Sequence, residues 1–252
     1  MKNSTIGISL LRALANEGFN IFKIDQAKKI AKDHNLNPNY IPKTLHYLLK
    51  LGWISRIKKG IYCFNAESGF GTPPHDFEIA AALVSPCAIS HWTAMHFHHL
   101  TDQTPNKIYA TIPTGTSVPR SIKQHYVFVQ TKKRHYFGFE KTWINDVQIQ
   151  ITDLERTLID GLQNPQYCGD FQEVLHAFKT AKDKIDLERI VNYALKLDTA
   201  IVKRLGWILD KLGISKGLRQ LKKTPIKGFR KLDPTGSLKG PYNKKWMIQE
   251  NI

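Results

Sequence analysis

The amino-acid sequence predicts an α+β protein: an N-terminal winged helix-turn-helix followed by a larger α+β domain with a mostly antiparallel sheet and flanking helices. Short amphipathic helical segments precede a basic β-hairpin before residue 66, and strand-like and helical segments then mix through the remaining residues. With 252 residues, of which 42% are hydrophobic, the chain can bury the core of one large domain or two ordinary ones. This composition excludes a disordered, collagen-like or disulfide-held chain.

Two helices are predicted before residue 35 from apolar spacing and from residues that begin or end helices. The first covers residues 5–16, and Gly18 stands where a helix C-cap is expected. Asp25 is a good N-cap for the second. One side of each helix is apolar, through Ile6, Leu10, Leu11 and Leu14 in the first and Ala27, Ile30 and Ala31 in the second.

A third helix is predicted to run to about Leu51. Asn37 can cap it, and Pro38 suits its first position because no hydrogen-bonded N–H is needed there. Its buried stripe consists of Ile41, Leu45, Leu48 and Leu49. The opposite face carries Asn39, Tyr40, Lys43, Thr44, Tyr47 and Lys50. This face is cationic, aromatic and amide-bearing without an acid, which suits a helix in the major groove of double-stranded DNA.

A basic β-hairpin is predicted to follow over residues 53–64. Apolar residues flank its turn, where Gly60 supplies the required backbone freedom. Arg56, Lys58 and Lys59 lie at or beside the tip. Three helices followed by such a hairpin are typical of a winged helix-turn-helix, whose wing lies along the DNA backbone or minor groove while the third helix reads base edges. We therefore expect these three residues and the exposed face of the third helix to contact DNA.

Composition also divides the chain into domains. Residues 1–66 are predicted to be the DNA-binding domain, residues 67–75 a linker rich in Gly and Pro, and residues 76–252 an α+β domain with a basic C-terminal tail. The patterns of the larger domain predict helices over residues 76–84, 91–99, 186–197 and 199–212, and strands over 107–112, 125–130 and 147–152. Thr152 and Glu155 have the spacing of a capping box at the start of a further helix.

Several phrases of the larger domain carry a family resemblance. They are SHWTAMHFHHLTDQTP, ITDLERTLIDGL, NPQYCGDFQEVLHA, VKRLGWILDKLG and a closing LDPTG…YNKKW. Together with the N-terminal KKGIY hairpin, they resemble the AbiEi family over nearly the whole chain. These proteins are antitoxins and transcriptional regulators of AbiE-type abortive-infection, or type IV toxin–antitoxin, systems. The TDLERT and RLGW phrases are the most specific.

The resemblance implies a function for each domain. The N-terminal domain would bind operator DNA upstream of its own operon and repress it, and the larger domain would carry antitoxicity. The toxin of such systems is similar to a nucleotidyltransferase, and the antitoxin generally counters its effect without a stable complex. Only the winged-helix positions carry over, namely the helix around residues 39–50 and the wing around 56–59. No antitoxicity residue can be transferred.

Catalytic and metal sites are not predicted. His91, His96, His98 and His99 cluster in sequence, but their spacing does not complete a metal site and no acid or cysteine is well placed beside them. A metal-dependent nuclease is the main enzyme alternative, and it would need clustered carboxylates that the predicted strands do not offer. We therefore expect no enzyme activity and no cofactor.

The positive charge is concentrated at the two ends of the chain. The formal net charge is +16, from 37 Lys and Arg against 21 Asp and Glu. Such ends favour a polyanionic partner, which is nucleic acid or, in a further alternative, an acidic protein in an interaction module that never touches DNA. A second basic surface is predicted near the C-terminus from Lys222, Lys223, Lys227, Arg230 and Lys231.

The cysteines and the hydropathy pattern indicate the compartment. Three cysteines without a CxxC pair are expected to be reduced thiols. No apolar run is long enough to span a membrane, and the N-terminus lacks the features of a signal peptide. A cytoplasmic protein without a membrane partner is therefore expected.

Overall fold

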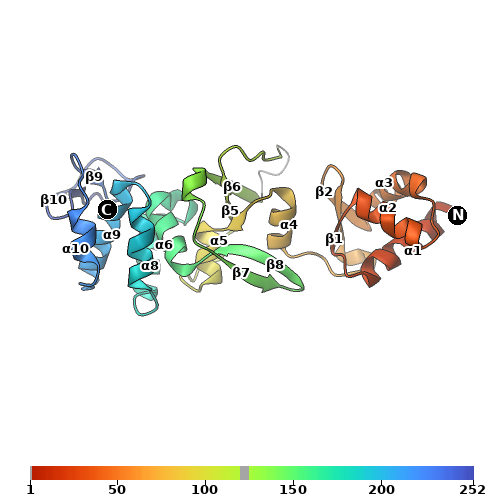
Figure 1. The fold of residues 1–252 in the computed structure, drawn as a ribbon, viewed down its shortest axis with the longest axis horizontal. Coiled ribbons are helices and arrows are strands. Elements are labelled where there is room, and N and C mark those ends of the chain that lie inside the picture. The colour runs from red at the N-terminus through yellow and green to blue at the C-terminus, as the bar shows by residue number, and fades with distance from the viewer. Residues whose placement is uncertain (1, 120–124) are drawn as a thin grey trace. The chain divides into compact units, whose positions relative to one another are not determined.

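A computed structural model describes residues 2–119 and 125–252 (Figure 1). The chain divides into two compact units. The first contains the residues up to Ser85 together with Ser117–Pro119 and Ile144–Val147, and the second contains the rest of the described chain. The domain boundaries given above stay a prediction.

The first unit holds the helices and the hairpin of a winged helix. Its elements are α1 (Lys2–Asn16), β1 (Ile21–Lys23), α2 (Ile24–Asp33), η1 (Pro38–Tyr40), α3 (Ile41–Lys50), β2 (Ile54–Lys58), β3 (Ile61–Phe64), η2 (Ala66–Ser68) and α4 (Asp76–Leu83). The strands form an antiparallel sheet of order β1-β3-β2. Cys63 on β3 pairs with Ile21 on β1 and with Ser55 on β2, so the predicted hairpin is joined by a short strand that precedes α2.

One apolar core holds this unit together. It takes the buried faces of α1, α2 and α3 and closes them against the sheet, where Phe22 stacks on Tyr62 with ring centroids 5.9 Å apart. Leu10, Leu14, Leu45 and Leu48 are fully or almost fully buried in it. Burial of each such side chain stabilises the fold by about 1.5–3 kcal/mol relative to an exposed position. The outward face of α3 is held in place by this burial.

The second unit combines two sheets with a group of helices. Its strands are β4 (Ala88–Ile89), β5 (Ile108–Pro113), β6 (Tyr126–Thr131), β7 (Phe139–Ile144), β8 (Val147–Thr152), β9 (Arg230–Lys231), β10 (Tyr242–Asn243) and β11 (Ile248–Gln249). The last residue of β7 and the first of β8 belong to the first unit. Its helices are α5 (His91–Phe97), η4 (Lys133–His135), α6 (Leu154–Gln163), η5 (Pro165–Tyr167), α7 (Phe171–Thr180), α8 (Leu187–Leu195), α9 (Thr199–Lys211) and α10 (Leu218–Lys223). The predicted fold class, a winged helix followed by a larger α+β domain, is confirmed.

The larger sheet has the strand order β6-β5-β4-β8-β7 and is mixed. The pairings of β5 with β6 and of β4 with β8 are parallel, while β4 and β5 are antiparallel. The sequence predicted a mostly antiparallel sheet. An alternating pattern of apolar residues specifies which face of a strand is buried, but not whether the neighbouring strand runs parallel or antiparallel to it. The sequence could therefore not distinguish a mixed sheet from an antiparallel one.

The start of α6 differs from the predicted capping box. The N-cap is Asp153, whose carboxylate accepts a hydrogen bond from the Arg156 N–H at 2.7 Å. Glu155 is buried and instead accepts from the Asp186 N–H at 2.8 Å and pairs with Arg189 at 3.3 Å. The box prediction at Thr152 is therefore wrong by one residue, because Glu155 is engaged by a segment some thirty positions further along the chain.

The C-terminal segment packs onto α9 through Trp246. This side chain is fully buried, and its indole N–H donates to Asp210 at 3.0 Å. Gly206 of α9 leaves the space for the ring, since a Cβ there would lie 2.6 Å from Cη2 of Trp246 and closer still to two other ring carbons. The glycine of the RLGW phrase therefore leaves a side-chain-free surface on α9, on which an aromatic residue about forty positions away packs.

Candidate nucleic-acid interface

The outward face of α3 presents the predicted mixture of side chains. Asn39, Lys43 and Lys50 are exposed, Tyr40 is 54% exposed, and Tyr47 is half-buried. The face is positioned by η1 and α3 together, because Asn37 accepts a hydrogen bond from the Asn39 N–H at 3.0 Å and starts the turn that leads into the helix.

Thr44 does not belong to this face, and its predicted exposure is wrong. The side chain is 1% exposed, and its hydroxyl donates to the Tyr40 carbonyl at 3.0 Å. Residue 44 lies three positions after Ile41 and four before Leu48, so it falls on the buried stripe of the helix. A hydroxyl at that position stays buried because the preceding turn satisfies its donor.

His46 is an exposed residue that the sequence reasoning missed. It lies three positions after Lys43 and four before Lys50, so the three side chains share one side of α3. The same periodicity that identified the lysines could have identified this imidazole. A histidine here adds a hydrogen-bonding group between two cations.

The basic residues of the hairpin differ in their exposure to solvent. Arg56 and Lys59 are exposed. Lys58 is half-buried, and its ammonium donates to the Leu83 carbonyl at the end of α4, at 2.9 Å. The C-terminal carbonyls of a helix attract cations because they carry partial negative charge. Lys58 therefore has an internal partner, which the prediction of a DNA contact did not include.

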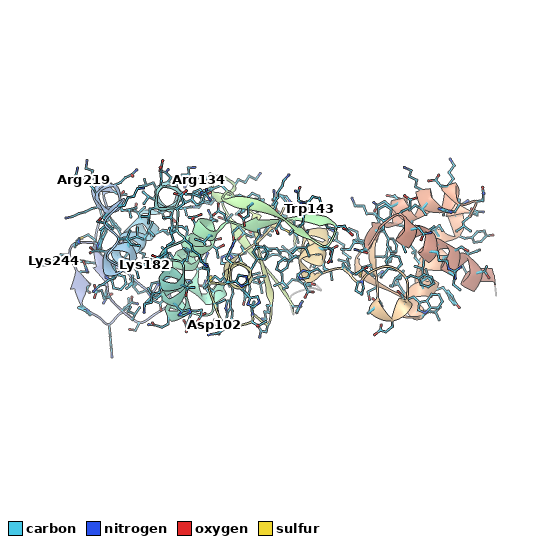
Figure 2. All side chains as sticks on the ribbon, turned by 90° about the horizontal axis from the view of Figure 1, so that it is seen from below. Asp102, Arg134, Trp143, Lys182, Arg219 and Lys244 are labelled. Carbon is cyan, nitrogen blue, oxygen red and sulfur yellow. The ribbon has the colours of Figure 1, made fainter. Side chains whose placement is uncertain are left out.

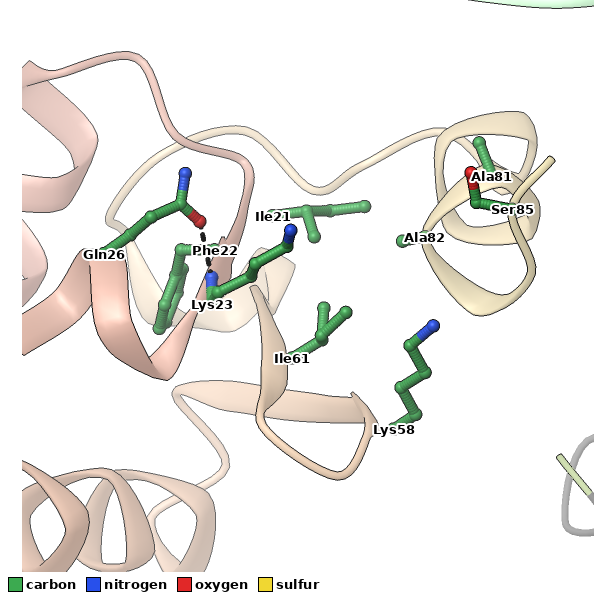
Figure 3. Close-up of a pocket in the computed structure, with 9 residues that line it drawn as sticks. All are labelled: Ile21, Phe22, Lys23, Gln26, Lys58, Ile61, Ala81, Ala82 and Ser85. Atoms are coloured by element: carbon green, nitrogen blue, oxygen red, sulfur yellow. Dashed lines mark hydrogen bonds between the residues drawn. The ribbon is translucent and has the colours of Figure 1, made fainter.

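Figure 3 shows Lys58 at the edge of a cavity of about 420 Å³ within the first unit. Apolar residues of the sheet, among them Ile21 and Ile61, form one side, and Ala81 and Ala82 of α4 form the other. The hydrogen bond from Lys58 to the Leu83 carbonyl connects the hairpin to α4. The cavity and the α3 face draw on different residues of this unit.

No carboxylate within the described part of the chain forms an ion pair with the cations of α3 or the hairpin tip. No acidic residue occurs between Asp33 and Glu67 in the sequence. Lys43, Lys50, Arg56 and Lys59 are therefore available to phosphates, with long side chains that reach several ångströms from the backbone.

The predicted second basic surface lies on α10 and the segment leading into β9. Lys222, Lys223, Lys227 and Arg230 are exposed. Lys231 is half-buried and its ammonium donates to the Gly236 carbonyl at 2.8 Å. Lys231 therefore stabilises a turn of the C-terminal segment, which the sequence reasoning did not foresee.

The four histidines clustered in the sequence do not form a common site: His91 is buried and His98 half-buried, while His96 and His99 are exposed. His91 is buried with its Nδ1 2.8 Å from the Ser90 hydroxyl, and burial lowers its pKa. His98 lies 2.7 Å from the Thr152 carbonyl. In the described ranges, no three His, Cys, Asp or Glu side chains are grouped to hold a metal ion, and the cysteines are free thiols. The helices of these same ranges include none long and apolar enough to cross a membrane.

Comparison with known proteins finds a family match within the first unit. Residues 9–65 match the family model described as "Transcriptional regulator, AbiEi antitoxin". The whole chain is similar in fold to the crystal structure of the RV2827C protein from Mycobacterium tuberculosis, with 12% sequence identity and a TM-score of 0.75, over 97% of this chain and 90% of that chain. No curated protein matches the sequence. The resemblance to the AbiEi family of transcriptional regulators and antitoxins is thus confirmed over residues 9–65.

Proposed function

We propose that this protein is a sequence-specific DNA-binding repressor, without enzyme activity, that also serves as the antitoxin of a type IV, AbiE-like toxin–antitoxin or abortive-infection system. It represses its own operon. The observation that carries the proposal is the outward face of α3, where Lys43 and Lys50 are exposed on a helix with no acidic residue. The match of residues 9–65 to the regulator family supports it.

In the proposed complex, α3 enters the major groove of the operator. Lys43, His46 and Lys50 face base edges or phosphates, while Asn39 and Tyr40 add hydrogen bonds and apolar contact at the start of the helix. Arg56 and Lys59 of the wing bind the phosphate backbone. Thr44 supports the helix from inside and makes no contact with DNA.

Operator binding of the full-length protein tests this arrangement. We expect Lys43→Ala or Lys50→Ala to weaken binding to the duplex upstream of the gene by about tenfold each, equivalent to about 1.4 kcal/mol. Lys182→Ala is the matched control, because it removes one exposed lysine of the second unit, between α7 and α8. Unchanged affinity in both α3 variants, measured by gel shift, would contradict the proposal.

The wing gives a second, independent measurement. Lys59→Ala should lower the slope of log affinity against log salt by about 0.9, as expected for one lost phosphate contact. Lys58→Ala should lower it less, because the ammonium of Lys58 is bound to the Leu83 carbonyl. Equal loss of slope in the two variants would show that Lys58 leaves that carbonyl when DNA binds.

The antitoxin role is tested separately from repression. A double variant of Lys43 and Lys50 should lose repression of an operon reporter and still restore growth to cells that express a nucleotidyltransferase-like toxin of an AbiE-type system. Loss of both functions would assign antitoxicity to DNA binding itself. If the pure protein cleaves DNA or RNA in the presence of Mg²⁺, it is a metal-dependent nuclease and the proposal is wrong. If it captures an acidic protein from a lysate treated with nuclease, it is better described as a protein-interaction module.

A further inference from the structure

Two aromatic side chains near the C-terminus remain exposed although they touch each other. Phe229 is 36% exposed and Tyr242 is 60% exposed, and their ring centroids lie 4.8 Å apart with the planes inclined by 59°. Trp246 in the same segment is fully buried. The fold therefore buries one aromatic ring of this segment and leaves the pair Phe229–Tyr242 partly open to solvent.

The small C-terminal sheet supports this pair. Phe229 directly precedes β9 and Tyr242 begins β10, and these two strands flank β11 in the order β10-β11-β9. β11 is buried, and it pairs in parallel with β9 and antiparallel with β10. The Arg204 guanidinium also donates to the Lys231 carbonyl of β9 at 3.0 Å. Both β9 and β10 are hydrogen-bonded to the buried β11, so this segment is a folded platform rather than an extended arm.

Cations surround the platform in the sequence. Lys227 precedes Phe229 by two positions, Arg230 follows it directly, and Lys244 follows Tyr242 by two positions; all three cations are exposed. The Arg230 guanidinium donates to the main-chain carbonyl of Phe229 at 3.3 Å, so this cation lies along the segment that carries the ring. Figure 2 shows the Lys244 side chain on the C-terminal part of the second unit.

The carboxylates of the same region are occupied by internal partners. Asp233 accepts from the N–H and hydroxyl of Thr235 at 2.8 and 2.7 Å. Glu250 accepts from the Trp207 indole at 2.6 Å and from Asn243 at 2.8 Å. Asp210 pairs with Lys245 at 2.7 Å. Lys227, Arg230 and Lys244 form none of the ion pairs found in the described chain, and they are left to interact with a partner.

We propose that this surface binds single-stranded nucleic acid, with unpaired bases stacked on Phe229 and Tyr242 and phosphates bound by Lys227, Arg230 and Lys244. Exposed rings beside cations are the combination that single-strand-binding proteins use, because every unpaired base offers an apolar face. In a duplex those faces are covered by neighbouring bases, so the aromatic pair has no counterpart there. The site is independent of the α3 face and does not rest on the proposed repressor function.

Fluorescence anisotropy of the full-length protein with labelled oligonucleotides tests this site. The probes are oligouridine and oligothymidine of about 12 nucleotides, a length within the range covered by single-strand-binding folds. The double variant Phe229→Ala, Tyr242→Ala should bind both probes more weakly, by about fivefold to about 150-fold for each stacked base that is lost. Similar affinities for the two probes indicate recognition through base stacking, and tighter binding of RNA indicates a contact to the 2′-hydroxyl; both support the site.

Three controls keep the result interpretable. Trp143→Ala removes an aromatic side chain that is 66% exposed on β7, and it should leave binding unchanged. Phe229→Tyr retains a ring and should retain binding. The double variant of Lys43 and Lys50 should keep oligonucleotide affinity while losing the operator duplex, so failure of one proposal is distinguishable from failure of the other.

Two outcomes would overturn the inference. Binding of the probes that depends on salt but is unaffected by loss of both rings would show a general cationic surface without stacking. Dissociation of a dimer in the ring-deleted variant, seen by sedimentation, with probe binding unchanged would show that the aromatic pair contacts a second copy of the chain. Both rings are partly exposed, so we expect the variant to fold, and circular dichroism checks this.

Discussion

Gly206 of α9 offers a sharp test of how the C-terminal segment is attached to the second unit. In the variant Gly206→Ala, the new Cβ would lie 2.6 Å from Cη2 of Trp246 and closer to Cζ3 and Cε3, far inside ordinary van der Waals contact. The helix backbone and a fully buried indole both resist movement. Trp246 must therefore shift or leave its site.

The magnitude follows from three effects. Forcing extra volume into a packed core costs about 1–3 kcal/mol when the neighbours can adjust. Complete loss of Trp246 from its site costs about 3–5 kcal/mol, as for truncation of a buried aromatic residue. Alanine has a helix propensity about 1 kcal/mol better than glycine, which offsets part of this. We expect Gly206→Ala to lower the free energy of unfolding by about 2–4 kcal/mol, since the steric effects exceed the gain in propensity.

Urea unfolding followed by circular dichroism measures the change, with the transition of the second unit analysed by itself because a chain with two compact units need not unfold in one step. The control is Trp246→Leu, in which a smaller side chain leaves room for the new methyl group. In that background Gly206→Ala should be nearly neutral, so a double-mutant cycle should give a strong coupling. A Gly206→Ala protein as stable as the parent would refute the steric reasoning.

Two further predictions concern charged groups in the second unit. Asp160→Asn should lower the free energy of unfolding by about 3 kcal/mol, because Arg156 lies 2.9 Å away in a buried pair and would keep an uncompensated charge; an unchanged urea midpoint would contradict this. Hydrogen bonds from Lys245 and Trp246 lower the pKa of Asp210. A carboxyl whose pKa is lower in the folded state stabilises the protein above its unfolded pKa of about 4, and this contribution is lost as the pH falls. The drop in thermal stability between about pH 5 and pH 3 should therefore be smaller in Asp210→Asn than in the parent, and an equal drop would show that other groups dominate.

Local periodicity was sufficient to predict the winged helix and most of its outward face. Lys43 and Lys50 are exposed as expected because the side that a helical residue faces follows from its spacing to Leu45 and Leu48. Thr44 was wrongly predicted to be exposed because of the polarity of its side chain, not because of its position on the helix. Its spacing to Ile41 already indicated burial, but a hydroxyl was assumed to face solvent.

Contacts between distant residues were not predictable in this way. The tether of Lys58 to the Leu83 carbonyl and the engagement of Glu155 by Asp186 and Arg189 join positions that share no local repeat. The residues next to Lys58 and Glu155 in the sequence were therefore compatible with charged side chains that face solvent. Only the packing of separate elements assigned Lys58 an internal partner.

The sequence by itself determined which segments form amphipathic helices, the absence of acid from α3 and the excess of positive charge, because these depend on residue type and on neighbours within a few positions. The tertiary structure decided the directions of the strands in the larger sheet, the pairing of Phe229 with Tyr242, and the fit of Trp246 against Gly206. These features join residues from separate elements of the chain. Their energies come from packing and hydrogen bonds that exist only once the chain has folded, so no short-range pattern encodes them.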